Sequence, residues 1–359
     1  LGVQGVVYAF IWNQFNLGLL NSYTPLTWIL AFVLYDLSYY WLHRCHHEIK
    51  FLWASHVVHH HGEEFNLSTA LRQTGTDFIF KWVFYTPMLF LGVPPEIFVT
   101  VAALNLIYQF WVHTEHIDRL GILDYIFVTP SNHRIHHAQN KEYIDANYGG
   151  VFIIWDILFG TFKDEKKELK PVYGTSKPLK SWNPFWANFE VWTEIFKDTW
   201  RTKSWKDKLR VWISRPKWRP KDVSEKYPIQ KNDLKVFKKY DPKVTLFAKI
   251  FGFGQLAFGS FYSQAFFFNA SSMGSTEIFL IGVNVTMILV FASLLFEGKA
   301  FGYRLEVVRA ALVLFAIYFG QFEFMQLTVL IHALICGVLA GYMTINNKPA
   351  EFNEARSES

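Results

Sequence analysis

The chain has 359 residues, of which 51% are hydrophobic and 19% aromatic, with a mean hydropathy of +0.13 and a net charge of +5. A soluble domain rarely needs 36 Phe, 17 Tyr and 14 Trp, so the composition predicts an integral membrane protein. The only two cysteines, Cys45 and Cys336, exclude a disulfide framework and a Cys2His2 zinc finger.

An apolar segment from Pro25 to Leu42 ends directly on His43, and we expect it to form a membrane helix. Asp36 lies seven residues before His43, on much the same face of that helix. Because a carboxylate in lipid is costly unless it is paired, Asp36 is either a residue that supports the histidines or a purely structural acid.

A second apolar stretch, from Phe78 to Trp111, is interrupted at Pro87 and again at Pro94 and Pro95. Each half has only about 15 to 17 residues, which is short for a full membrane span. We therefore predict a helical hairpin that enters the bilayer and returns. The histidines before the hairpin and His113 after it then share one membrane face.

Residues 163–243 form a basic, Trp-rich segment with 22 Lys and Arg against 11 Asp and Glu, and with seven of the 14 Trp. Beside membrane helices, this composition is typical of a cytoplasmic segment that lies at the interface. Nucleic-acid binding is the alternative for a basic stretch, and the apolar segments on both sides disfavour it. The segment therefore places the histidines on the cytoplasmic side.

Four more apolar segments lie within residues 244–345, at about 245–268, 276–296, 307–320 and 324–344. They contain one histidine, His332, which we interpret as a packed residue rather than a ligand. We expect a scaffold of membrane helices or the wall of a lipid chamber, followed by a polar tail at residues 346–359. Together these elements predict an all-α, polytopic integral membrane protein.

Twelve of the 13 histidines fall between His43 and His61 or between His113 and His137. Three boxes have metal-ligand spacings, H-x3-H at residues 43–47 and H-x2-HH at residues 56–60 and 133–137. Spacings of three and four put side chains on one face of a helix, so each box can aim several imidazoles at one point. Eight imidazoles are too many for one tetrahedral ion, so the boxes predict two metal ions.

Imidazole alone suits Zn, Cu, Fe and Ni, so the ligand type leaves the metal open. The pair His47-Glu48 is not part of an H-E-x-x-H metalloprotease motif, because Phe51 stands where the second histidine would be. A metal transporter would carry its ligands within the membrane segments, whereas these boxes lie just outside them. A histidine-rich surface is the remaining alternative.

The order of the boxes resembles the fatty acid hydroxylase and sterol desaturase superfamily of integral membrane di-iron oxygenases. The strings around the boxes are similar to those of one branch, the alkylglycerol monooxygenases: FNLSTALRQ, YQFWVHTE, TPSNHRIHH, IDANYGG and WDILFGTF. The resemblance covers residues 35 to about 174. Beyond them, only the membrane pattern and the basic segment agree.

This resemblance implies nine iron ligands: His43, His47, His56, His59, His60, His113, His133, His136 and His137. It also implies a functional acid at Glu48, beside the first box. His46, His61 and His116 fall outside the expected ligand positions.

The resemblance further implies that O2 is activated at two iron ions on the cytoplasmic side of the endoplasmic reticulum or of a bacterial inner membrane. Hydroxylation of the ether-linked carbon of an alkylglycerol lipid then releases a fatty aldehyde and a glycerol derivative, with tetrahydrobiopterin as the reductant. No Gly-rich dinucleotide motif is evident, so reducing equivalents or a pterin-recycling system must come from outside. The alternative is a hydroxylase or desaturase of sterols, carotenoids or fatty acyl chains that uses an external electron-transfer protein. In both cases residues 1–162 are the histidine-box domain.

Overall fold

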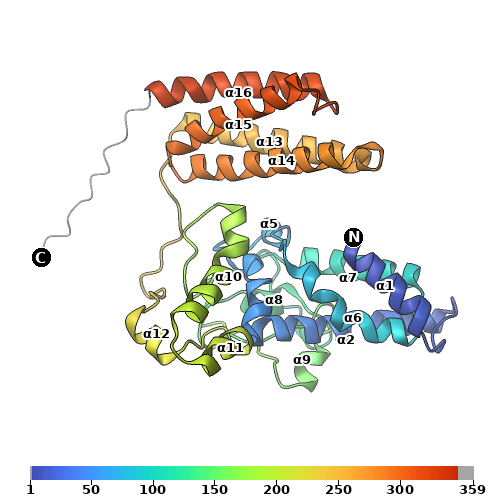
Figure 1. Cartoon of the computed structure of the whole chain (residues 1–359). Coiled ribbons are helices and arrows are strands. Elements are labelled where there is room, and N and C mark those ends of the chain that lie inside the picture. The colour runs from blue at the N-terminus through green and yellow to red at the C-terminus, as the bar shows by residue number, and fades with distance from the viewer. Residues whose placement is uncertain (1, 347–359) are drawn as a thin grey trace, which may run out of the picture. The chain divides into compact units, whose positions relative to one another are not determined.

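The computed structural model describes residues 2–346, and the chain is mostly helical within them (Figure 1). This described part contains no β-strand, and two isolated bridges join Phe127 to Phe152 and Ala138 to Tyr173. Contacts divide the chain into a histidine unit, residues 1–179 and 188–239, and a C-terminal unit, residues 180–187 and 240–359.

The helices of the first 239 residues are mostly short, and several of them end in a histidine box. They are α1 (Gly2–Phe15), α2 (Pro25–Glu48), α3 (Lys50–Ala54), α4 (Val57–His60), α5 (Leu67–Ala70), α6 (Lys81–Phe90), α7 (Pro95–Trp111), α8 (Pro130–His136), α9 (Ile154–Leu158), α10 (Pro184–Arg201), α11 (Trp205–Ile213) and α12 (Lys221–Lys226). Single 3-10 turns lie at Asp77–Ile79 and Gly121–Tyr125.

Helix α2 delivers the first box. Its start is fixed by Thr24, whose side chain accepts a hydrogen bond from the backbone N–H of Thr27, and by Pro25 in the first turn. It ends at Glu48 because the next residue, Ile49, is extended. The buried face of α2 packs against α6 and α7, in a core that includes the stacked rings of Tyr35 and Tyr85.

Helices α6 and α7 form from the two halves of the apolar stretch predicted as a membrane hairpin. The chain turns at Gly92, which has a φ of +90°, just before Pro94 and Pro95 begin α7. At 1.5 Å per residue, the ten residues of α6 span about 15 Å, roughly half of a bilayer core. Buried side chains from both helices, Met88 and Ile97 among them, share one core with α2, so the hairpin folds back onto that helix.

The four apolar segments predicted for the last third of the chain each form one helix: α13 (Leu246–Asn269), α14 (Ser275–Phe296), α15 (Phe301–Tyr318) and α16 (Gln326–Asn346). A 3-10 turn at Ala270–Ser272 lies between the first two. Successive helices pack side by side in a bundle (Figure 1). Of the helices described, α14 and α16 have both the length and the hydropathy that suit a membrane span.

The interior of this bundle contains a buried polar cluster. Arg309 on α15 donates hydrogen bonds to Glu306 at 2.9 Å and to Asn284 on α14 at 2.7 Å. Gln255 on α13 donates to Glu306 at 2.9 Å. The cluster therefore ties α13, α14 and α15 together through charges that have no access to water.

His332 on α16 lies flat against Phe258, with ring centroids 3.6 Å apart, and belongs to neither histidine group described below.

Candidate metal centre

The three boxes and His113 meet in the histidine unit as two groups of imidazoles. Within each group the ligand atoms all lie within 4.8 Å of one another. The first histidine group is His43, His47, His56, His60 and His136, and the second is His59, His113, His133 and His137. The nine residues expected as ligands therefore fall into two clusters of five and four.

Each H-x2-HH box contributes to both groups, which differs from our expectation that the members of a box converge on one point. In the second box, His56 and His60 are four residues apart and enter the first group, whereas His59 enters the second. In the third box the division is reversed, because only His136 joins the first group. Residues at i and i+4 share a helical face more closely than i and i+3, and this small angular difference selects the group.

The tautomers of two rings in the second group leave a pair of nitrogen lone pairs facing each other. Nδ1 of His113 donates to the carbonyl oxygen of Gln109 at 2.8 Å, and Nδ1 of His59 donates to that of Arg72 at 3.3 Å. A neutral imidazole carries one proton, so both Nε2 atoms are unprotonated. These Nε2 atoms are 3.3 Å apart and cannot hydrogen-bond to each other. A cation bound by both nitrogens would remove the repulsion between their lone pairs.

The nitrogen separations also fit ligands of one ion. Two nitrogens that bind an ion at about 2.1 Å lie roughly 3.0 Å apart when their bonds meet at a right angle. Nε2 of His133 is 2.9 Å from Nε2 of His113 and 3.1 Å from Nε2 of His137. In the first group, the Nε2 atoms of His56 and His60 are 3.2 Å apart. Both groups therefore have the spacing of a metal-ligand set.

Burial keeps these imidazoles neutral. It lowers the pKa of His59, His133 and His137 well below the usual value, and neighbouring imidazoles lower it further. Burial also lowers the pKa of His113 and of His136 to about 4. Neutral imidazole is the form that binds metal ions, so both groups are in a binding form at neutral pH.

Backbone carbonyls aim the rings of the first group. Nδ1 of His43 donates to the carbonyl oxygen of Tyr148 at 2.9 Å, and Nδ1 of His136 donates to that of Ala146 at 2.8 Å. Nε2 of each ring is buried and has no hydrogen-bond partner among the residues that the structure describes. A ligand histidine typically donates its second ring N–H in this way, which fixes the tautomer and the ring orientation. The loop that carries Ala146 and Tyr148 is thus part of the site.

Two buried carboxylates fix that loop. Asp36 accepts hydrogen bonds from the backbone N–H groups of Val151 and Phe152, and from the Asn105 side chain on α7. Asp36 therefore supports the histidines through the backbone, which decides between the two roles expected from the sequence. Gly150 is required here because a Cβ atom would lie 2.8 Å from the Asp36 carboxylate.

The second carboxylate, Asp156, accepts from the backbone N–H groups of Tyr148 at 2.7 Å and Gly149 at 2.8 Å. It also accepts from the Thr161 hydroxyl at 2.7 Å. Burial raises the pKa of Asp156 to about 6, and these hydrogen bonds oppose the rise.

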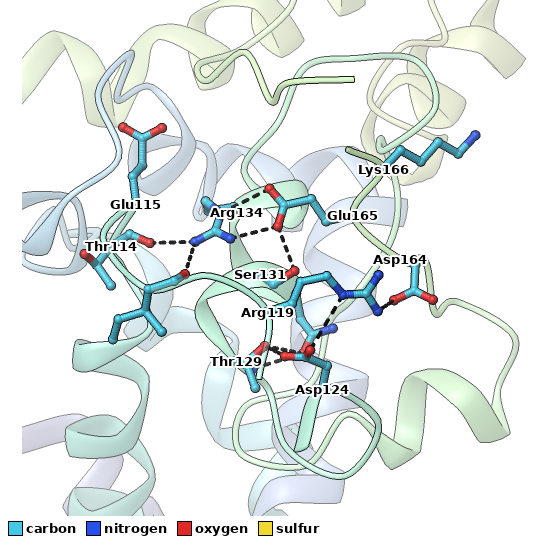
Figure 2. Close-up of polar contacts among 12 residues, drawn as sticks. Thr114, Glu115, Arg119, Asp124, Thr129, Ser131, Arg134, Asp164, Glu165 and Lys166 are labelled. Carbon is cyan, nitrogen blue, oxygen red and sulfur yellow. Dashed lines mark hydrogen bonds and ion pairs between the residues drawn. The ribbon is translucent and has the colours of Figure 1, made fainter. Parts of the chain in front are cut away.

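A network of polar contacts fixes the third box from outside (Figure 2). Arg134, between the ligands of that box, pairs with Glu165 through two nitrogens at 3.2 and 2.8 Å. It also donates to the backbone carbonyls of Thr114 and Ile117, just after His113. Ser131 donates to the same Glu165 carboxylate at 2.7 Å. One buried guanidinium therefore joins α8 to the segment that carries His113.

Glu48 is about one-third exposed, and its carboxylate accepts a hydrogen bond from Nε of Arg44 at 3.0 Å, one helical turn earlier. It therefore lies at the end of α2 beside the first group. His46 faces the Asp77 carboxylate at 3.3 Å, and His61 lies 3.9 Å from Glu190, so both have acidic neighbours and stay outside the two groups. His116 is exposed and belongs to neither group.

Comparison with known proteins agrees with this geometry. The model of the fatty acid hydroxylase family matches residues 28–161, a range that contains both histidine groups. An alkylglycerol monooxygenase from Xenopus tropicalis is 37% identical over 316 residues, which cover 88% of this chain and 70% of the frog protein. The chain belongs to the alkylglycerol monooxygenase family.

Other relatives in and beyond this family match shorter parts of the chain. The human alkylglycerol monooxygenase is 43% identical over 213 residues, which cover 59% of this chain and 47% of the human protein. An ornithine lipid hydroxylase from Rhizobium tropici is 33% identical over 135 residues, 37% of this chain and 41% of that protein. No solved structure matches the chain significantly. Membership of this family makes the chain a monooxygenase that acts on a lipid and suggests iron as the metal.

Proposed function

We propose that the chain is a membrane di-iron monooxygenase that hydroxylates the ether-linked carbon of alkylglycerol lipids. The observation that carries the proposal is the pair of converging histidine groups in a chain 37% identical to an alkylglycerol monooxygenase over 88% of its length. Groups of five and four imidazoles suit two ions. In the second group, unprotonated nitrogens of His59 and His113 face each other. In the first group, Nε2 of His43 and of His136 is buried and has no hydrogen-bond partner among the described residues.

Iron ions held by the two groups would supply the activation of O2 and the removal of a hydrogen atom from the substrate. The chain's own residues fix the ligands: the Tyr148, Ala146, Gln109 and Arg72 carbonyls hold the imidazole Nδ1 protons. The ring of Phe65 covers the second group, 5.3 Å from His137 and 5.5 Å from His113, and keeps water from that side.

The overall reaction consumes the alkyl lipid, O2 and two electrons with two protons from tetrahydrobiopterin. One oxygen atom enters the carbon next to the ether oxygen and the other leaves as water. The product is a hemiacetal, whose carbon–oxygen bond to glycerol breaks to give a fatty aldehyde and a glycerol derivative. Recycling of the pterin requires a separate reductant.

We further propose a polytopic membrane protein whose histidine groups face the cytoplasm, in the endoplasmic reticulum of a eukaryote or the inner membrane of a bacterium. In this arrangement residues 1–162 are the catalytic part, residues 163–243 lie at the interface and residues 244–345 are membrane helices. The excess of basic residues in 163–243 and the hairpin of α6 and α7 support it.

A hydroxylase or desaturase of other lipids, fed by an electron-transfer protein, is the second candidate. It is supported by the ornithine lipid hydroxylase relative, whose similarity is limited to 37% of this chain. The two candidates differ in the reductant. We expect purified protein to release fatty aldehyde from an alkylglycerol when tetrahydrobiopterin is added. Turnover only with added ferredoxin or cytochrome, or only of a lipid without an ether bond, would favour the second candidate.

A further inference from the structure

The ring of Tyr148 lies beside the first histidine group, and its hydroxyl group has no hydrogen-bond partner among the described residues. Its side chain is fully buried, and its hydroxyl oxygen makes no hydrogen bond with the described part of the chain. A buried hydroxyl normally has a partner, and an orphaned one in a native protein points to a catalytic role, a water or an ion. The proposed function uses only the backbone carbonyl of this residue.

The ring of Tyr148 touches the imidazoles of the first group. Its centroid lies 5.3 Å from that of His47, 5.8 Å from that of His43 and 5.9 Å from that of His136. The second group has an apolar ring in the corresponding role, because Phe65 lies against its imidazoles. The two groups therefore have different aromatic neighbours: a tyrosine ring, which carries a hydroxyl, borders the first, and a phenylalanine ring borders the second.

Hydrogen bonds on both sides fix the backbone of Tyr148. Its N–H donates to Asp156 at 2.7 Å and its carbonyl accepts from His43 at 2.9 Å. The next residue, Gly149, has a second hydrogen bond to the same carboxylate. A phenol held in this way is preorganised, so a ligand that reaches it gains a hydrogen bond without reorganisation of the loop.

We propose that the Tyr148 hydroxyl is a catalytic hydrogen-bond donor to the small ligand that binds an ion in the first histidine group. This inference rests on the proposed function, because it needs a metal ion in that group. It makes the first group the place where a small oxygen or nitrogen ligand is held. The second group, bordered by Phe65, is then the more apolar of the two.

The test uses azide as the probe, because it binds metal ions and accepts hydrogen bonds. Purified full-length wild-type protein and the variant Tyr148→Phe are titrated with azide, and binding is followed by absorbance. We expect Tyr148→Phe to retain its iron and to bind azide about tenfold more weakly, the loss typical of a hydrogen bond to a charged group. The matched control is Tyr85→Phe, which removes another fully buried hydroxyl in the same unit, away from the histidines.

Equal azide affinity in wild-type and Tyr148→Phe protein would overturn the inference, and so would loss of iron in that variant alone. If Tyr148→Phe does not fold, the wild-type protein decides the matter, since an O–H donor predicts a shift of the bound azide stretching band in D2O. No shift overturns the proposal. If the wild-type protein contains no iron and does not turn over an alkylglycerol, the proposed function itself is contradicted. This result differs from the results that would overturn the inference about Tyr148.

Discussion

The rings of His43 and His136 lie 4.4 Å apart, although His43 is near the end of helix α2 and His136 is in α8. Both rings donate to carbonyls of the same loop, through Tyr148 and Ala146. The first histidine group therefore exists only when α8 and this loop have docked on α2. Metal binding and the folding of the histidine unit are thus expected to be coupled.

Purified protein should contain about two iron ions per chain, because the two histidine groups have separate sets of ligands. Elemental analysis of protein from iron-supplied cells measures the ratio. One ion per chain would mean that a single group is occupied, and none would contradict the di-iron site. Zinc at the same ratio would keep the two sites and change only the identity of the metal.

The variants His136→Ala and His59→Ala should each abolish turnover and lower the iron content, since each removes a ligand from a different group. The variant His332→Ala is the control and should keep nearly full activity, because His332 packs on Phe258 in the C-terminal bundle. Aldehyde release and iron content are measured for all three. Similar activities in the three variants would refute the ligand assignment.

The variant Arg134→Leu should destabilise the histidine unit by about 3 kcal/mol, because it removes a buried guanidinium and leaves the partly buried Glu165 carboxylate without its cation. It should also lose iron, since Arg134 fixes the third box to the segment after His113. Lys239→Leu breaks the more exposed pair with Glu64 and should cost less than about 1 kcal/mol. Thermal unfolding and iron analysis distinguish the two, and equal losses would argue against this role of Arg134.

Replacing Glu48 by Gln should lower turnover at least about tenfold if this carboxylate supports a ligand or binds the pterin. Loss of iron would indicate that it orients an imidazole, and a higher tetrahydrobiopterin requirement with iron retained would indicate a pterin contact. The control Arg44→Gln removes the cation of the ion pair and keeps the Glu48 carboxylate. If Glu48→Gln keeps the wild-type rate, iron content and pterin dependence, then Glu48 has no functional role beyond its ion pair with Arg44.

Cysteines introduced at Lys141 and Lys203 should react from the same side of sealed vesicles, because the histidine boxes and the basic segment are both expected to face the cytoplasm. Both positions are exposed in the histidine unit. Cys45 and Cys336 are first replaced by Ala so that the background is low. Labelling of the two positions from opposite sides would contradict the proposed orientation.

The sequence was sufficient to predict the helices of the C-terminal unit and eight of the nine imidazoles in the two groups, because these rest on local periodicity or spacing. The ninth, His113, was expected from the family resemblance. The sequence did not predict how the boxes divide between the groups, since the difference between i+3 and i+4 matters only once other helices are in place. Backbone donors and acceptors leave no residue-type signal, so the roles of Ala146 and Gln109 were missed. Arg134 was missed for another reason: its partner Glu165 is 31 residues away.

In the proposed membrane arrangement, the charges inside the C-terminal bundle are expected to constrain the order of insertion. Helix α15 carries Glu306 and Arg309, which are satisfied by each other, by Gln255 on α13 and by Asn284 on α14. Alone in lipid, α15 would lose its amide partners on these neighbours, which makes independent partitioning unfavourable. We therefore expect α13 and α14 to remain beside the translocation machinery until α15 has been synthesised. The three helices would then enter the bilayer as one assembled group.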